Sequence, residues 1–219
     1  MARLLITGFG PFPRVPDNPS ARVARRLASS PHLRRILGAA PDCLILDTRY
    51  AALDTQLAPA LARQPAAVLM IGVAASRRRV CVETRAVNRV SRLFPDASGA
   101  VSRSLAFESG APALRRSPAT EAVRVSLMRA GLKVVASRDA GRYLCNAAYF
   151  RALAQDCPAI FLHIPMPART KRPLRSDRPH HDPDAWVAAF AEAARVLMQR
   201  ARRDQGVATS SVRRSTESR

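Results

Sequence analysis

Three polar side chains have the types and positions that nucleophilic chemistry requires: a cysteine, a histidine and a glutamate. Cys145 follows an Ala-Gly turn in the stretch SRDAGRYLCNAAYF and opens an expected helix. Helix N-termini carry partial positive charge and unpaired N–H groups, so they lower the pKa of a thiol and can hold an oxyanion. On this local argument, a structural cysteine buried in a core is an equally good interpretation.

His163 and Glu83 complete the set. His163 lies in the apolar run FLHIP, 18 positions after Cys145 (163 − 145), which leaves room for one helix and one returning strand. A lone histidine in such a run is also typical of core packing. Glu83 stands in the strand-like VCVETRAVN, where a buried carboxylate needs a partner, either His163 or a nearby arginine such as Arg79 or Arg85. Together the three residues could form a thiol hydrolase, in which imidazole moves the proton and the carboxylate orients the imidazole.

The surrounding pattern alternates strands with helices. Apolar runs rich in branched residues predict strands over 3–9, 42–48, 66–73, 132–137 and 159–165. Capping residues and amphipathic periodicity predict helices over 20–30, 51–64, 117–131, 145–155 and 184–203, with Pro59 interrupting the second. This alternation predicts an α/β fold, a three-layer α/β/α sandwich around a mostly parallel twisted sheet. We expect one domain over 1–201 and a disordered basic tail over 202–219. In such sheets, sites collect at the C-terminal ends of the strands.

The charge balance raises the question of a nucleic-acid partner. The 219 residues carry a formal net charge of +20, and nearly all of the positive charge is arginine, since Lys133 and Lys171 are the only lysines. Aromatic residues make up 5% and do not interleave with the arginine runs, as a stacking platform for single strands would require. The scattered arginine and alanine excess indicates a compositional bias, so we do not expect nucleic acid as the partner.

Other function classes find little support. The cysteines at 43, 81, 145 and 157 include no C-x-x-C pair, and no apolar stretch approaches the roughly 18 residues of a membrane span. We see no signal peptide and expect a reducing, cytoplasmic setting. The segment SDRPHHDPD holds His180 and His181, but adjacent histidines in an irregular segment rarely converge on one ion. We therefore expect no metal, no cofactor and no membrane partner.

Four stretches of the chain resemble one enzyme family. They are TGFGPFPRVPDNPS, IGVAASRRRVCVETRAVN, SRDAGRYLCN and FLHIPMP. They resemble the family patterns T-G-F-x-P-F with N-P-S, E-x-x-A-x-N, S-x-x-A-G-x-[FY]-x-C-N and F-x-H-x-P. The family is pyroglutamyl-peptidase I, also called pyrrolidone-carboxylate peptidase, whose members are cysteine peptidases that remove an N-terminal pyroglutamyl residue. The similarity runs from Arg3 to about Pro167.

The resemblance implies roles for particular residues. Cys145 would be the nucleophile, His163 the general base and then acid, and Glu83 the carboxylate partner. Asp96, in FPD, stands where the family has a second acidic residue that supports the site. The partner would be a peptide with a blocked N-terminus, and relatives of this family are often dimers or tetramers.

The resemblance also implies an apolar pocket for the lactam ring, with Phe9, Phe12, Val73 and Leu144 as the candidate substrate-binding residues. From the residues alone, Phe9 and Phe12 could equally be core packing under a proline-rich loop. The chain departs from the family at VAAS, where many members have Gln-Ala-Gly-Gly, and Val73 offers no side-chain hydrogen bond. The alternative hypothesis is therefore a divergent relative with altered or weak activity that binds a small ligand or a peptide N-terminus.

Overall fold

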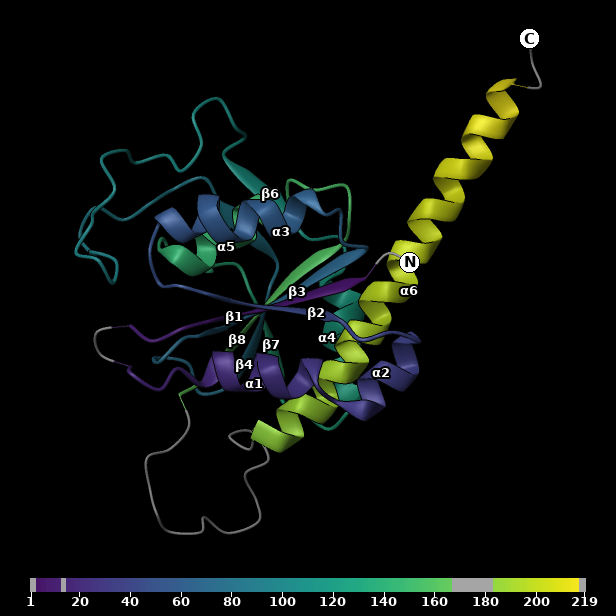
Figure 1. Ribbon diagram of the computed structural model, residues 1–219, viewed down its shortest axis with the longest axis horizontal. Helices are drawn as coiled ribbons and strands as arrows, with labels where there is room; N and C mark the ends of the chain where they lie inside the picture. Colours follow the sequence, from purple (N-terminus) through teal and green to yellow (C-terminus); the bar gives the residue numbers. More distant parts are fainter. Residues whose placement is uncertain (1–2, 13–14, 167–182, 217–219) are drawn as a thin grey trace.

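A six-stranded sheet forms the centre of the protein, with helices on both of its faces (Figure 1). The computed structural model describes residues 3–12, 15–166 and 183–216. The strand order of the central sheet is β2-β1-β3-β8-β4-β7, and β5 and β6 form a separate two-stranded sheet. This architecture confirms the expected three-layer α/β fold.

The strands and helices have the following bounds. The strands are β1 (Leu4–Phe9), β2 (Asp42–Leu46), β3 (Ala67–Val73), β4 (Val80–Glu83), β5 (Arg85–Val87), β6 (Leu114–Arg116), β7 (Val134–Ser137) and β8 (Ala159–Ile164). The helices are α1 (Pro19–Ala28), α2 (Pro31–Leu37), the π-helix η1 (Leu53–Leu57), α3 (Ala58–Ala62), α4 (Thr120–Arg129), α5 (Leu144–Ala152) and α6 (Pro183–Thr216).

Two of the six central strands run against the other four. Strands β2, β1, β3 and β8 are mutually parallel, whereas β4 pairs antiparallel with β8 and parallel with β7. The sheet is therefore mostly parallel, as expected. The C-terminal end of β7 therefore lies at the opposite edge of the sheet from the C-terminal ends of β1, β3 and β8.

The two faces of the sheet carry separate hydrophobic clusters. One cluster joins β-strand residues to α1, α2, α4 and α6, and its largest buried side chains include Trp186 and Phe190. The other joins the opposite face to η1, α3 and α5, and includes Tyr149, Phe150 and Phe161. Successive side chains of a strand alternate between these two clusters, so α5 can contact only every second residue of each strand.

Local chemistry explains where several helices begin. Asn18 caps α1 by accepting from the Ser20 N–H at 3.1 Å, and Pro19 occupies the first turn, as the sequence predicts. Ser30 and Pro31 start α2, a seven-residue helix that the sequence analysis missed. The interruption at Pro59 is accommodated because the π-helix η1 ends at Leu57 and leaves the proline in the first turn of α3.

The last helix is longer than expected. We predicted a disordered tail from residue 202, but α6 continues to Thr216 and its final turns extend beyond the rest of the fold (Figure 1). The segment contains no proline, and an ion pair between Arg200 and Asp204 at 3.6 Å spans one turn. Such i,i+4 pairs support a helix even where no core covers it.

Candidate active site

Glu83 and His163 form a buried pair on the sheet. Glu83 ends β4 and is fully buried, and its Oε1 lies 2.8 Å from Nδ1 of His163 on β8. The antiparallel register places Glu83 opposite Phe161 and Cys81 opposite His163. Glu83 and His163 are therefore diagonal neighbours, and both lie on the face of the sheet that α5 covers. Diagonal cross-strand positions remain within reach of long side chains. Oε2 of Glu83 is buried without a hydrogen-bond partner among the described residues, so His163 is the counter-charge for this carboxylate.

The surroundings of His163 favour its protonated form. Burial disfavours the imidazolium, but hydrogen bonds with Cys145 and Glu83 and the negative charges of these two groups outweigh it, and the pKa of His163 rises to about 9. Because Nδ1 donates to the Glu83 carboxylate, Nε2 is left to face the thiol. The three residues that the sequence singled out therefore meet at one place.

Gly72 makes room for the thiol. It pairs with His163 across β3 and β8, and its side-chain position faces α5. A Cβ built there would lie 3.0 Å from Sγ of Cys145 and 2.6 Å from Cζ of Phe161. Only glycine allows both groups to occupy this space. Gly72 was not predicted as a site residue, although a single glycine inside an otherwise apolar strand is a known signal of close approach.

Helix α5 is anchored directly behind the nucleophile. Asn146 is fully buried; its Oδ1 accepts the Val87 N–H at 2.9 Å, and its Nδ2 donates to the carbonyls of Val87 at 2.8 Å and Arg89 at 3.2 Å. Tyr149, one turn further along, donates its hydroxyl to the Glu83 carbonyl at 2.9 Å. These bonds hold the helix against β4 and β5. Among the described residues no side chain caps the helix at Tyr143, so the first-turn N–H groups beside Cys145 are left for another acceptor.

Asp96 lies in a loop beside the site and organises it without touching His163. Its Oδ1 accepts from the Ser98 N–H at 2.8 Å and the Ala100 N–H at 3.0 Å, and its Oδ2 accepts from the Tyr50 N–H at 2.8 Å. Burial by itself would raise the pKa of Asp96. The hydrogen bond from the Ser98 hydroxyl and the three backbone hydrogen bonds lower the pKa by more than burial raises it, so the net shift is downward.

The loop reaches the nucleophile through two tyrosines. The Tyr50 ring packs edge-on against Tyr143 at 5.8 Å, and the Tyr143 hydroxyl donates to the Pro95 carbonyl at 3.0 Å. Tyr143 directly precedes α5. Burial, followed by the negative charges of Asp96 and Cys145, raises the pKa of Tyr143 to about 12, so it stays a neutral donor. Contacts of Tyr50 and Tyr143 therefore connect Asp96 to the start of α5.

Three of the four candidate pocket residues lie in the cluster under α5 or in the loop after β1, and the fourth lies on the other face of the sheet. Phe9 is 3% exposed and packs against Phe161, with ring centroids 6.3 Å apart, and Leu144 is 2% exposed in the same cluster. Phe12 is half-buried in the loop after β1, where it pairs with Val15. Val73 packs against the cluster on the opposite face of the sheet, so the structure separates its side chain from Cys145.

The N-P-S motif has a local structural role. Nδ2 of Asn18 donates to the Gly10 carbonyl at 2.9 Å, and the Ser20 hydroxyl accepts from the Phe9 N–H at 3.0 Å. These bonds fix the start of the loop that carries Phe12. The side chains of the motif therefore fix the end of β1 and the start of the loop after it.

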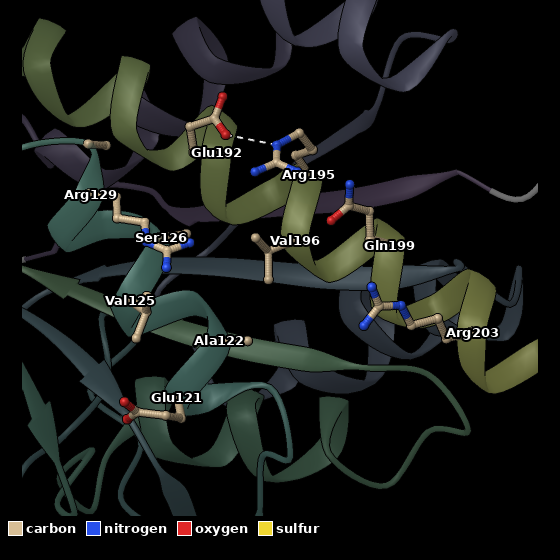
Figure 2. A pocket seen from close by; sticks show the side chains of 11 residues that line it. Glu121, Ala122, Val125, Ser126, Arg129, Glu192, Arg195, Val196, Gln199 and Arg203 are labelled. Carbon is tan, nitrogen blue, oxygen red and sulfur yellow. Dashed lines mark hydrogen bonds and ion pairs between the residues drawn. The ribbon is translucent and has the colours of Figure 1, made fainter.

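Other features of the described residues lie apart from these three side chains. A groove of about 640 Å³ between α4 and α6 is lined by charged residues that include Arg129 and Arg203, and it holds no candidate residue (Figure 2). The residues that the structure describes contain no His, Cys, Asp and Glu cluster able to hold a metal, and His180 and His181 lie outside them. Among the same residues, no helix combines the length and apolar character of a membrane span.

Comparisons with known proteins agree with this geometry. Residues 2–200 match the family described as pyroglutamyl peptidase. The pyrrolidone-carboxylate peptidase of Gloeobacter violaceus is 36% identical over 170 residues, 74% of this chain and 81% of that protein. That of Deinococcus radiodurans is 33% identical over 189 residues, 82% of this chain and 85% of that protein.

Solved structures give the same result. The pyrrolidone carboxyl peptidase of Thermus thermophilus superposes with a TM-score of 0.75 at 31% identity, covering 89% of this chain and 100% of that one. The enzyme of Thermococcus litoralis gives a TM-score of 0.80 at 25% identity, covering 93% and 96%. With the family match extending over nearly the whole chain, this protein belongs to the pyroglutamyl peptidase family.

Proposed function

We propose that this protein is a cysteine exopeptidase that removes an N-terminal pyroglutamyl residue from peptides, with Cys145 as nucleophile. The observation that carries the proposal is the 2.8 Å contact between Glu83 and His163, buried beside the thiol. A carboxylate, an imidazole and a thiol in series are the arrangement in which the base is oriented by a third group. The family membership supplies the substrate class.

The first step is attack on the pyroglutamyl carbonyl. The pKa of about 9 keeps His163 protonated at neutral pH, so an imidazolium faces the sulfur of Cys145. The sulfur forms a bond to the carbonyl carbon, and the carbonyl oxygen takes the negative charge. The uncapped N–H groups at the start of α5 are placed to hold that oxyanion.

The second stage releases the peptide and restores the enzyme. His163 gives its Nε2 proton to the leaving nitrogen, the C–N bond breaks, and a pyroglutamyl thioester remains on Cys145. His163 then takes a proton from water, whose oxygen attacks the thioester and releases pyroglutamate. Glu83 keeps the imidazole oriented through both proton transfers.

Recognition of the lactam relies on shape more than on a side-chain amide. We propose that the ring lies against Phe12, with Phe9 and Leu144 forming the buried wall behind it. An apolar slot favours an uncharged lactam over a free α-ammonium, which loses its hydration on entry. Val73 takes no part in this contact, because its side chain packs on the opposite face of the sheet.

The test is release of aminomethylcoumarin from pyroglutamyl-aminomethylcoumarin under reducing conditions, the state expected of thiols in the cytoplasm. We expect turnover by the wild type, none by Cys145→Ala, and wild-type turnover by the matched control Cys157→Ala, since Cys157 lies after α5 and away from His163. A folded wild-type protein without turnover would favour the alternative hypothesis, a relative that binds peptide ends without cleaving them.

A further inference from the structure

Three segments that carry arginines border the Cys145–His163 site. They are the β3–β4 connection over 74–79, the segment 85–92, and the β7–α5 connection over 138–143. The Ala74 N–H donates to the Ile164 carbonyl at 3.0 Å, directly after His163 on β8. The Ser91 N–H donates to the Arg142 carbonyl at 2.7 Å, directly before α5. These contacts place all three segments around the nucleophile and its base.

The arginines of these segments have no carboxylate partners among the described residues. The ion pairs of arginine elsewhere in the described chain are Arg3–Asp42, Arg22–Asp17, Arg26–Asp184, Arg115–Glu108, Arg124–Glu121, Arg151–Asp54, Arg151–Glu108, Arg195–Glu192 and Arg200–Asp204. Each of these pairs lies outside the three segments. The arginine excess of the chain is therefore partly neutralised over much of the fold but not at this border.

Asp139, the one acidic residue within these segments, and Glu83, which lies between two of them, are engaged in other ways. Glu83 is buried against His163, and the Asp139 carboxylate accepts the Gly141 N–H at 3.0 Å. The exposed arginines Arg78, Arg79 and Arg142 consequently leave a net positive charge on the surface beside the site.

Two further arginines are held in place by carbonyl groups. Nη2 of Arg77 donates to the Asp139 carbonyl at 3.3 Å, and Nε of Arg85 donates to the Arg138 carbonyl at 2.9 Å. A carbonyl orients a guanidinium without cancelling its charge. The charge of Arg77 acts on the residue next to the base: burial raises the pKa of Cys81, which lies opposite His163, and Arg77 partly opposes that rise.

We propose that this positive border selects pyroglutamyl peptides with a carboxylate on the residue that follows the pyroglutamyl group, an inference that rests on the proposed function. The carboxylate can be the side chain of an aspartate or glutamate, or the C-terminus of a dipeptide. Unpaired guanidinium groups attract carboxylates and bind them with directed N–H bonds. Concentrated charge of one sign at a cleft also raises the local concentration of oppositely charged substrate.

Matched substrates measure this preference. One arm compares kcat/KM for pyroglutamyl-Glu-Ala-amide, pyroglutamyl-Gln-Ala-amide and pyroglutamyl-Lys-Ala-amide, and the other compares pyroglutamyl-alanine with its amide. We expect the carboxylate substrate to be favoured over its neutral isostere by about threefold to tenfold at low salt, and the lysine peptide to be worst. The ratio should approach one at about 1 M NaCl, where the Debye length is about 3 Å. A preference for the glutamate peptide identifies an acidic side chain as the favoured carboxylate, and a preference for pyroglutamyl-alanine over its amide identifies the C-terminus of a dipeptide.

Double variants test whether the arginines beside the site cause the carboxylate preference. Arg78→Gln/Arg79→Gln and Arg138→Gln/Arg142→Gln should each lower the ratio of carboxylate to neutral substrate. The control, Arg34→Gln/Arg129→Gln, removes the same charge from exposed positions on α2 and α4, and its ratio should match the wild type.

These experiments distinguish a failure of the carboxylate preference from a failure of the proposed peptidase activity. No turnover of any of these peptides would overturn the proposed function. Turnover of the neutral peptides with equal kcat/KM for the carboxylate ones would overturn the inference alone. A preference that persists at about 1 M NaCl, or that falls as much in the control as in the border variants, would also overturn it.

Discussion

A methyl group added at Gly72 is expected to disable the site without removing a catalytic group. In Gly72→Ala the new Cβ would lie 2.6 Å from Cζ and 2.8 Å from Cε1 of Phe161, and 3.0 Å from Sγ of Cys145. Carbon atoms in ordinary contact are about 3.5–4.0 Å apart. The aromatic ring therefore has to move by about 1 Å, and the sulfur is displaced with it or separated from His163.

The size of the effect follows from this displacement. A misplacement of about 1 Å at reacting groups reduces turnover by about 100-fold. Overpacking of a well-packed core costs about 1–3 kcal/mol, which corresponds to a fall in Tm of roughly 2–10 °C for a chain of this length. We therefore expect a folded protein with a lowered Tm and a kcat/KM for pyroglutamyl-aminomethylcoumarin about 100-fold below the wild type.

A matched control separates displacement from general destabilisation. Ile71→Val changes the preceding residue of β3, whose side chain is buried on the opposite face, and should cost about 0.5–1.5 kcal/mol with activity retained. Calorimetry gives both Tm values, and the coumarin assay gives both rates. A Gly72→Ala protein with kcat/KM within twofold of the wild type would refute the reasoning, because the space above Gly72 would then not be needed by Cys145.

Three further outcomes follow from the buried groups. In Glu83→Gln the pKa of His163 falls from about 9, so the alkaline limb of the kcat/KM profile should move to lower pH and the rate at pH 7.5 should drop by about 10²–10⁴-fold. The pKa of His163 in the folded state is raised from 6.5 to about 9, so protonation of His163 stabilises the fold fully below pH 6.5, and this stabilisation is lost as the pH rises through about 9. Thermal melts between these pH values should show a fall in Tm, and the fall should be smaller in Glu83→Gln. Asn146→Ala removes the partners of the Val87 N–H and the Arg89 carbonyl, while the Val87 carbonyl keeps the Arg89 N–H at 2.8 Å. The two unpaired groups cost about 2–4 kcal/mol and should lower Tm by roughly 5–15 °C, whereas unchanged melting would contradict the anchoring role.

Much of the fold could be predicted because strong local signals mark it. The Asn18-Pro19-Ser20 sequence fixes the start of α1, and long apolar runs identify β1, β3 and β8. The short helix α2 was missed because seven residues carry little periodicity. The π-turn before Pro59 was not foreseen because a proline was interpreted only as an interruption.

The identity of the site residues was predictable, but their geometry was not. Motif resemblance selects Cys145, His163 and Glu83, whereas linear spacing does not reveal that Glu83 reaches His163 diagonally across two antiparallel strands. Gly72 and Asn146 were not identified, because neither carries reactive chemistry and each acts through close packing or buried hydrogen bonds. The position of Val73 was also not foreseen. Side chains alternate between the two faces along β3, so the side chain of Val73 lies on the face opposite Gly72.

The return from Cys145 to His163 also has a simple physical basis. Helix α5 descends about 11 Å from Cys145 to Ala152 at 1.5 Å per residue, and β8 rises about 13 Å from Ala159 to His163 at 3.3 Å per residue. The two lengths nearly cancel, so a helix and a strand joined by a short loop bring the thiol and the imidazole to the same level of the sheet. This return does not need β7 and β8 to be parallel, and they are not.

The reversed direction of β4 follows from the length of one connection. Only residues 74–79 separate β3 from β4, and parallel strands of one sheet need a crossover of about a dozen residues or more. The short connection therefore forces β4 to run back down the sheet, with the position beside β3 left for β8. That reversal places Cys81 opposite His163 and puts Glu83 on the same face two residues later, within reach of the imidazole. The same connection holds Arg77, Arg78 and Arg79 at the end of β8 where His163 lies, so one short loop sets both the base–carboxylate pair and the charge beside it.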